Sequence, residues 1–418
     1  LAGADIEALV HTLTLAAINA TDGDDRAKAL GHAAKVQHRR VQDNALALAA
    51  RYPEMKALPT ERWDNNPFLV GAPNGVIDLR TGNLRPGRPE DKITKRVGVP
   101  FDPNAKAPRW ERFLNEVFPN KALVEWIKLA LGYTLTGLTG EQVFFLCYGS
   151  GHNGKTTLFR HLRAVLGDYA TDTSLRAFEA VKYARGDAPS PAVMIFDGPR
   201  LVTASEARVD GGLGARLDEA IVKDLTGGDV ITARPLYKEE ETFFVTGRLW
   251  IGVNHRPKVA DNSPAFWGRV RCVPFTQSFE GDDRDPRLND VLASEAAGIL
   301  AYLVRSAKDY LSTREELGWC ITQAPGGRKM QTDWRQETDH LYRYVQERCE
   351  LGPYRISTAA LVRDLSDWWL AEGLKDRYFP SNAAIKRRLV ELNMKPCRVN
   401  EAGSLVRGFE GLHLKGNL

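Results

Sequence analysis

Apolar residues follow two different spacings along this chain, and the change between them divides it into regions. Between residues 1 and 50 the apolar side chains recur at helical spacing and predict two helices, over 4–19 and 25–51. From about 142 to 279, short apolar runs alternate with helical patterns, as in a sheet with helices between its strands. The expected strands are 143–148, 200–204 and 248–253, with a further candidate at 192–196. The central region therefore predicts an α/β fold.

The regions on either side of this sheet are mainly helical. Before it, a hairpin is expected at 74–87, with helices at about 110–118 and 121–131. After it, helices are expected through 286–311, and a Pro-Gly-Gly break at 325–327 marks a boundary. Three more helical patterns then precede a β-like tail: 333–349, 357–371 and 381–393. Three helices followed by a hairpin predict a winged-helix-like module.

Composition narrows the class of protein. The chain has 418 residues, more than one ordinary core holds, with 43% hydrophobic and 26% charged residues. It has no apolar run of the roughly 18 residues that a membrane span needs and no secretory signal, which argues for the cytoplasm and against a membrane. Its five cysteines form no Cys-x-x-Cys pair, which argues against a zinc site. The net charge of +4 does not by itself predict a nucleic-acid partner. Because the chain starts at Leu1 rather than Met, we expect a longer parent protein.

The sequence VFFLCYGSGHNGKTTL carries the strongest chemical signal in the chain. It fits the P-loop pattern G-x-x-x-x-G-K-[ST] between an apolar strand and an amphipathic helix, and the alternative is a chance glycine-rich turn. Backbone N–H groups of such a loop face a phosphate chain at the positive end of the helix. Lys155 would reach the β- and γ-phosphates, and the Thr156 hydroxyl would bind Mg²⁺. The residues expected to bind ATP and Mg²⁺ are Gly149, Ser150, Gly151, His152, Asn153, Gly154, Lys155, Thr156 and Thr157.

Two acidic residues compete for the role of holding the Mg²⁺ shell and polarising the attacking water. Glu206 follows the apolar strand RLVTAS, whose C-terminal end we expect beside the P-loop strand. Asp197 ends the apolar run VMIF but continues directly into the turn Gly198-Pro199, so we favour Glu206. A solvated carboxylate at a strand end is the alternative for either residue.

Three further features lie downstream of the P-loop. Tyr237 and Lys238 lie at the tip between two strand-like runs and suit the backbone of single-stranded nucleic acid, with a solvated surface hairpin as the alternative. Asn254 ends a strand, where its amide can orient the hydrolytic water or sense the γ-phosphate, or instead cap a buried group. Arg269 and Arg271 alternate along AFWGRVRCVPF. Either can serve as an arginine finger for a neighbouring subunit's γ-phosphate or form a surface ion pair.

The order of these motifs resembles that of the phage and plasmid primase-helicases, which are superfamily 3 helicases. The resemblance covers about 70–310 and rests on GYTLTGLTGEQVFFLCYGSGHNGKTTL, RLVTASEAR, KDLTGGDVITARPLYKE, IGVNHRPKV and AFWGRVRCVPF, in that order. It implies a helical collar or oligomerisation region (1–135), an AAA+-like P-loop core (136–324) and then the winged-helix-like region (328–418). It also implies a ring, usually a hexamer, that shares ATP sites between subunits and translocates along single-stranded DNA.

The resemblance also assigns roles to single residues. These fall on Lys155 and Thr156 (Walker A), Glu206 (Walker B), Asn254 (sensor), Arg269 (finger) and Lys238 (DNA-contacting hairpin). Ser205 stands where many members carry a second carboxylate, and Gly268 stands where many carry another arginine. The finger assignment therefore stays open between Arg269 and Arg271.

Basic residues gather on the last expected helix. Six basic and two acidic residues lie between Asp376 and Arg398. We expect Lys386, Arg387 and Arg388 to contact phosphates of duplex or forked DNA without reading sequence, with a protein-binding module as the alternative. Family members often carry a primase-polymerase domain upstream, but the acidic run at 22–25 reads as a turn or helix cap rather than as part of one.

The leading hypothesis is an ATP-driven replicative DNA helicase, in the host cytoplasm if a phage encodes it. A second hypothesis is an origin-binding initiator or loader that uses ATP to control assembly on DNA. A third is an AAA+ remodeller of proteins, for which we would expect an aromatic-hydrophobic pore loop in place of Tyr237-Lys238.

Overall fold

The chain divides into two units, which are described separately. The computed structural model describes residues 12, 23–36, 38, 40–41, 43–44, 48, 63–179, 191–205, 217–228, 230–233, 241–259, 263–374, 379–401 and 403–415. The first unit comprises Leu1–Asn65 and Arg88–Thr94, and the second comprises Asn66–Gly87 and Lys95–Leu418. In the first unit, α2 (Gly23–Val36) overlaps the predicted helix at 25–51, and η2 (Pro89–Asp91) is a single 3₁₀ turn.

The second unit is built on a parallel five-stranded sheet. Its strands are β4 (Phe144–Tyr148), β5 (Ala170–Ser174), β6 (Leu201–Ser205), β9 (Arg248–Val253) and β10 (Val270–Pro274). Their spatial order is β10-β4-β9-β6-β5, and every neighbouring pair is parallel. Parallel sheets are covered on both faces, which explains why β4 and β9 are almost continuously apolar and buried. The predicted strands at 143–148, 200–204 and 248–253 and the α/β fold are confirmed.

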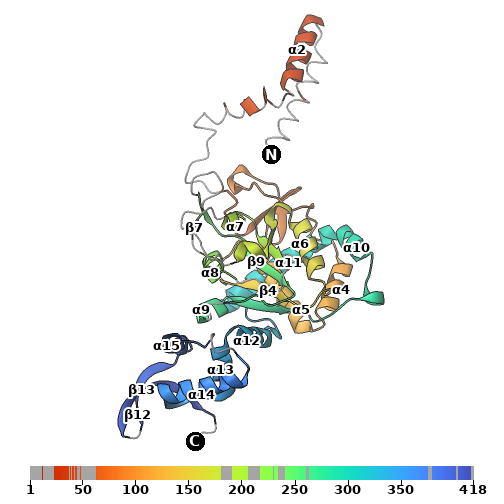
Figure 1. Cartoon of the computed structure of the whole chain (residues 1–418). Coiled ribbons are helices and arrows are strands. Elements are labelled where there is room, and N and C mark those ends of the chain that lie inside the picture. Colours follow the sequence, from red (N-terminus) through yellow and green to blue (C-terminus); the bar gives the residue numbers. More distant parts are fainter. Residues whose placement is uncertain are drawn as a thin grey trace. The chain divides into compact units, whose positions relative to one another are not determined.

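Alternate side chains of β4 enter two separate cores. Phe145 and Cys147 pack in one cluster with α4 (Pro108–Val117), α5 (Lys121–Leu135), α6 (Lys155–Leu166) and α11 (Ala296–Leu317). Phe144 and Leu146 pack in the other with α8 (Glu219–Gly227), α9 (Pro264–Trp267) and α12 (Gly327–Thr338). Figure 1 shows β4 and β9 between these two groups of helices. The sheet is therefore the middle of three layers.

Smaller elements surround this core. The predicted hairpin at 74–87 is confirmed as part of an antiparallel sheet of β1 (Leu69–Ala72), β2 (Gly75–Asp78) and β3 (Asn83–Arg85). A second antiparallel pair joins β7 (Val230–Ala233) to β8 (Glu241–Phe244), and the tip between them lies outside the described residues. Short elements complete the connections: η3 (Gly167–Tyr169), η4 (Leu175–Phe178), η5 (Gly281–Asp283) and α10 (Leu288–Ser294).

Two expectations about the sheet are wrong. The candidate strand at 192–196 is instead a short helix, α7 (Pro191–Met194), followed by a turn. The strand β6, which precedes Glu206, does not lie beside the P-loop strand β4, because β9 separates them. The sequence shows which segments are strands, but the order of parallel strands depends on how their connecting helices cross the sheet.

The C-terminal part of the chain has its own core. The helices α13 (His340–Arg348), α14 (Thr358–Ala371) and α15 (Asn382–Glu391) pack against a sheet of β11 (Cys349–Ser357), β13 (Ser404–Leu414) and β12 (Lys395–Glu401). Trp368 and Trp369 are buried in this core, as their helical spacing indicates. The domain limits and the winged-helix assignment stay predictions. Helix α12, which begins at the Pro-Gly-Gly break, buries Met330 and Trp334 in the core of the main sheet.

Candidate nucleotide-binding site

The P-loop joins the end of β4 to the start of α6, and its glycines are required by close contacts. Gly154 has φ +89°, and a Cβ atom there would lie 2.6 Å from Cγ2 of Val117 on α4. A Cβ atom on Gly149 would lie 2.1 Å from the carbonyl oxygen of Phe275. A side chain at either position would therefore displace the loop or its neighbours. The glycine-rich sequence forms a tightly packed cradle at the N-terminus of α6.

Lys155 is held inside this cradle. Its side chain is buried, and its ammonium donates to the Gly149 carbonyl oxygen at 2.6 Å and to Oδ1 of Asn254 at 3.1 Å. The sheet order explains the second contact, because β9 lies directly beside β4 with Val253 opposite Tyr148. Both strands run in the same direction, so Asn254 and the P-loop emerge at the same edge. The predicted sensor residue thus lies at the P-loop.

A cavity of about 690 Å³ opens beside the loop. Its lining includes Gly151 to Thr157 of the P-loop and α6, together with Asn254 at the end of β9. The segment after β10 covers one side, since the N–H groups of Phe275 and Phe279 donate to the carbonyl oxygens of Tyr148 and His152, respectively. A volume in this range is ordinary for a pocket that holds a molecule of nucleotide size.

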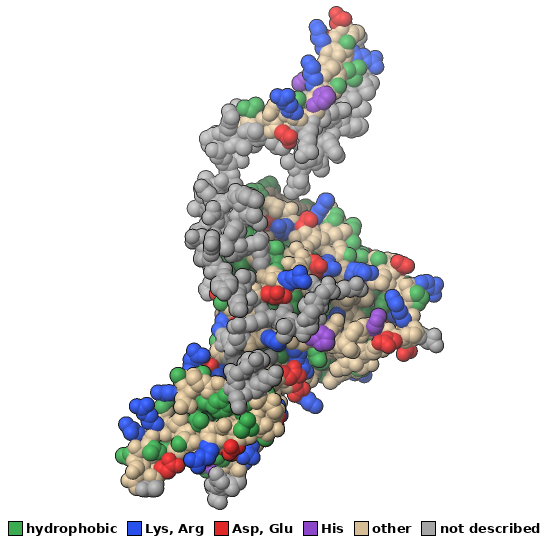
Figure 2. All heavy atoms as spheres, viewed as in Figure 1, with side chains coloured by type: hydrophobic (Ala, Val, Ile, Leu, Met, Phe, Trp, Pro, Cys, Tyr) green, Lys and Arg blue, Asp and Glu red, His purple; other side chains and the backbone are tan. Residues whose placement is uncertain are grey.

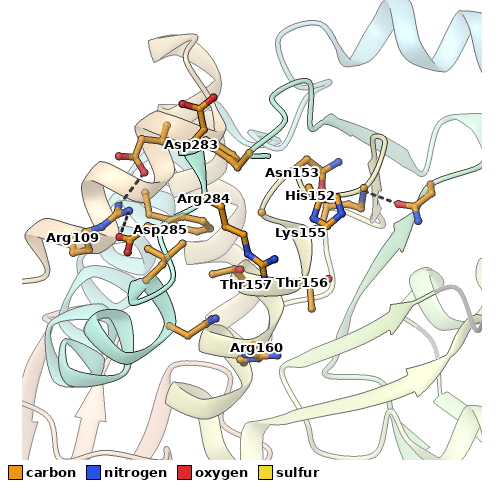
Figure 3. Close-up of a pocket in the computed structure, with 18 residues that line it drawn as sticks. Arg109, His152, Asn153, Lys155, Thr156, Thr157, Arg160, Asp283, Arg284 and Asp285 are labelled. Atoms are coloured by element: carbon orange, nitrogen blue, oxygen red, sulfur yellow. Dashed lines mark hydrogen bonds and ion pairs between the residues drawn. The ribbon is translucent and has the colours of Figure 1, made fainter. Parts of the chain in front are cut away.

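Six charged residues of the cavity are absent from the sequence prediction, including Arg160 of α6 and Asp283 of η5. Arg109 and Glu116 come from α4, whereas Arg284 and Asp285 come from the segment between β10 and α10. Arg109 forms ion pairs with Glu116 at 3.0 Å and with Asp285 at 3.4 Å. Figure 3 shows Arg109 and Asp285 at the opposite end of the cavity from His152 and Lys155, with Arg284 extending between them toward Thr156 and Thr157. No motif marks the residues from α4 and from the segment before α10, because they reach the P-loop only through the packing of α4 and α10.

The structure describes one of the two candidate acidic residues, Asp197, but not the other, Glu206. Asp197 lies before the start of β6 and bridges to Val245, which precedes β9. It is therefore at the amino edge of the parallel sheet, whereas the P-loop is at the carboxyl edge. Ser205 ends β6 at the carboxyl edge and is exposed, and Glu206 lies outside the described residues, as do Tyr237 and Lys238.

The two arginines proposed as fingers have different surroundings. Arg271 is held by backbone oxygens: it donates to Ile321 at 2.6 Å and to Gly268 at 2.7 Å, and burial lowers its pKa below the usual range. Arg269 donates to Oγ1 of Thr226 at 3.1 Å and to the Ala265 oxygen at 2.9 Å. Arg269 also precedes β10 and lies next to the first residue of β4. The length of β4, roughly 16 Å for five residues, separates this edge from the P-loop.

The basic residues of the C-terminal helix also divide into two kinds. Lys386 and Arg387 are exposed on α15. Arg388 is only 12% exposed and forms ion pairs with Asp339 and with Glu391. Figure 2 shows Lys and Arg side chains gathered over α15 and the strands β12 and β13. The free basic surface at this helix therefore consists of Lys386 and Arg387, and Arg388 supports the fold.

Comparisons with known proteins show which families and viral proteins the chain resembles. The family model described as D5 N terminal like matches residues 3–119. The "Putative helicase L207/L206" of Acanthamoeba polyphaga mimivirus is 30% identical over 52% of this chain and 22% of its own length. The "Putative primase C962R" of African swine fever virus is 28% identical over 78% of this chain and 34% of its own length. These likenesses to viral putative helicases and primases support a primase-helicase family.

The "Putative helicase 022R" of Frog virus 3 is a further relative, 25% identical over 52% of this chain and 29% of its own length. The chain thus spans about a fifth to a third of the length of these curated relatives. Among solved structures, the apo form of the NrS-1 C terminal region covers 90% of each chain at 12% identity, with a TM-score of 0.48. In the described part of the chain, no helix is long and apolar enough to cross a membrane.

Proposed function

We propose that this chain is the ATP-driven motor of a superfamily 3 replicative DNA helicase. The observation that carries the proposal is the contact of buried Lys155 with Asn254 at the floor of the P-loop cavity. A lysine alone can bind phosphate, but an amide from the neighbouring strand adds a group suited to sensing the γ-phosphate or orienting water. That combination suits hydrolysis better than simple nucleotide binding.

ATP and Mg²⁺ fit the groups that line the cavity. Gly149 and Gly154 have no room for a Cβ atom beside Phe275 and Val117, so glycine at these positions lets the loop pack closely at the N-terminus of α6, where phosphates bind. Thr156 is exposed at the start of α6 and would offer its hydroxyl to Mg²⁺, which neutralises phosphate charge when bound. Glu206 would complete the metal shell and polarise water. Among the described residues, no group of three or more His, Cys, Asp or Glu side chains forms a separate metal site.

The proposed ring follows from the location of Arg269. This residue lies at the amino edge of the sheet and the P-loop lies at the carboxyl edge, so Arg269 is remote from the P-loop of its own chain. An arginine finger in this position would serve the ATP site of a neighbouring subunit, as in a closed hexameric ring in which each subunit completes the next site. We propose that Lys238 contacts single-stranded DNA in the channel and that Lys386 and Arg387 contact forked or duplex DNA. We assign no priming step to this chain.

Strand displacement from a labelled fork tests the proposal. The unmodified chain should displace the strand with ATP and Mg²⁺ but not with a non-hydrolysable analogue. Glu206→Gln should bind ATP and fail to displace, whereas Asp197→Asn, the matched control at the other edge of the sheet, should displace normally. ATP-dependent DNA binding without displacement would instead support an origin-binding initiator. ATP hydrolysis that DNA does not stimulate would support a remodeller of proteins.

A further inference from the structure

The P-loop cavity has two ends of opposite charge. At the P-loop end, Lys155 lies on the cavity floor, Arg284 extends toward Thr156 and Thr157, and Arg160 of α6 adds a further cation (Figure 3). At the far end, Arg109 bridges the carboxylates of Glu116 and Asp285, and Asp283 adds a third carboxylate to the lining. A triphosphate carries several negative charges and therefore belongs at the cationic end. The carboxylate end must then receive the uncharged part of the ligand, which is the nucleoside.

Helix α4 is fixed firmly enough to position this far end. The Glu295 carboxylate accepts the N–H groups of Arg109 and Trp110, at 3.0 and 2.9 Å, which satisfies the first turn of the helix. Near the C-terminal end of the helix, Val117 packs so closely against Gly154 of the P-loop that a Cβ atom would not fit between them. Arg109 therefore has a defined position relative to the P-loop.

The two carboxylates that Arg109 bridges are not equivalent. Both oxygens of Glu116 already accept strong hydrogen bonds, from Arg109 at 3.0 Å and from Arg112 at 2.8 Å. Asp285 accepts the N–H of Arg287 at 3.0 Å on one oxygen and has only a long contact, 3.4 Å, from Arg109 on the other. The Asp285 side chain is also 41% exposed, compared with 30% for Glu116. Asp285 is the carboxylate with acceptor capacity to spare.

We propose that Asp285 accepts a hydrogen bond from a ribose hydroxyl of the bound nucleotide and that Arg109 is the residue that positions it. The inference rests on the proposed ATP binding. A carboxylate is the group that nucleotide-binding proteins of other folds use to bind a ribose hydroxyl. Because the acceptor is charged, loss of the hydroxyl should cost about 10-fold to 100-fold in affinity. If the bound hydroxyl is the 2′-OH, the site selects ribonucleotides over deoxyribonucleotides, which matters for a motor that works where deoxyribonucleotides are being consumed.

Equilibrium binding of ATP, 2′-deoxy-ATP and 3′-deoxy-ATP tests this assignment. The unmodified chain should bind ATP at least about 10-fold more tightly than one of the two deoxy analogues. Asp285→Ala should bring all three affinities to within about 2-fold of one another, near the level of the disfavoured analogue. Asp285→Asn keeps an acceptor for the Arg287 N–H and should leave an intermediate preference. Arg109→Gln should reduce the preference as well, which a purely structural role would not do.

Matched controls separate the inference from the proposed function. Asp290→Ala removes the same charge from an exposed position of α10 outside the cavity and should leave the preference unchanged. If ATP binds but the unmodified chain treats all three nucleotides alike, or if Asp285→Ala retains the preference, the ribose assignment is overturned and ATP binding stands. If no nucleotide binds, both the ribose assignment and the proposed function fail.

Discussion

The ammonium of Lys155 lies 3.1 Å from Oδ1 of Asn254, a residue 99 positions further along the chain. The contact joins the two neighbouring strands β4 and β9 at their carboxyl ends. The same ammonium also contacts the Gly149 oxygen, so Lys155 is already oriented by two oxygen atoms of the protein. A ligand phosphate would therefore meet a lysine whose position is set before binding.

We expect substitutions of Lys155 and of Asn254 to impair different steps, nucleotide binding and turnover, respectively. Lys155→Ala removes the buried P-loop cation and should abolish nucleotide binding and turnover. Asn254→Ala should keep binding within a few-fold but lower turnover about 10-fold to 100-fold, the range expected when a hydrogen bond to a charged group is lost. Titration calorimetry and steady-state phosphate release measure the two effects. Equal losses of binding in both variants would show that Asn254 serves only to hold the lysine.

We expect substitution of Arg269 to impair ATP turnover and substitution of Arg271 to impair stability. Arg269→Ala should leave ATP binding largely intact and lower turnover roughly 10³-fold, as for an arginine finger. Mixing it with Lys155→Ala should restore some activity, because a mixed ring contains interfaces with both Lys155 and Arg269 intact. If subunits exchange and the Arg269→Ala mixture shows no rescue, but the mixture of Arg271→Ala with Lys155→Ala does, the arginine finger is Arg271.

Arg271→Ala should instead affect stability. Its guanidinium donates to the oxygens of Ile321, Gly268 and Val270, and these would lose their partner. The expected loss in the free energy of unfolding is about 1–3 kcal/mol. Denaturant unfolding of the purified variant measures this loss of free energy. Arg269→Ala is the comparison, because the Arg269 side chain donates to fewer backbone oxygens than Arg271 does.

Lys238 should act on DNA and not on ATP. A phosphate contact is independent of sequence, so Lys238→Ala should weaken binding to all single strands about equally and flatten the salt dependence by about one unit of slope. ATP turnover without DNA should stay near normal, while DNA-stimulated turnover and unwinding fall together. Lys308→Ala, an exposed lysine on α11, is the control. Normal unwinding by Lys238→Ala would mean that the hairpin between β7 and β8 is a surface feature.

We expect the buried and the exposed basic residues of α15 to have different roles, in stability and in DNA binding. Arg388 and its partner Asp339 are 12% and 6% exposed, so Arg388→Ala would leave a buried carboxylate unpaired and cost about 3–5 kcal/mol of stability. Lys386→Ala and Arg387→Ala should leave the melting temperature nearly unchanged and lower affinity for duplex and forked DNA. Thermal melting and fork binding of the three variants distinguish these outcomes. A stable Arg388→Ala variant with weakened fork binding would return Arg388 to the DNA surface.

The cysteines should differ sharply in reactivity. Burial raises the pKa of Cys272 and Cys320 to about 12 and that of Cys349 to about 11, and it raises the pKa of Cys147 further. At pH 8 these four thiols are almost entirely protonated, and the thiolate fraction rises only as the pH approaches those values. Cys397, which is only partly buried, should be the thiol that iodoacetamide labels in the native protein. Mass spectrometry of peptides before and after denaturation checks this pattern.

The sequence predicts the strands and the loop between β4 and α6 well, because both depend on neighbours in the chain. The spacing of GSGHNGKTT defines its loop, and the apolar runs define β4, β6 and β9. It fails where a run is ambiguous: PAVMIF is as apolar as a strand, but it forms a four-residue helix and a turn. Asp285 and Arg109 were missed for a different reason. They meet only because α4 and the segment before α10 pack on the P-loop, and no local pattern reports such a contact.

Arg200 determines where a shorter fragment of this protein can begin. Its side chain is 1% exposed, and its guanidinium donates to the oxygens of Asn66, Pro67 and Leu69, which precede the P-loop by many residues. A truncation at residue 136, the expected start of the ATPase core, would remove all three acceptors and leave a cation inside the protein. Expression of the proposed ATPase core alone should therefore start before Asn66, even though the residues gained contain none of the predicted ATPase motifs.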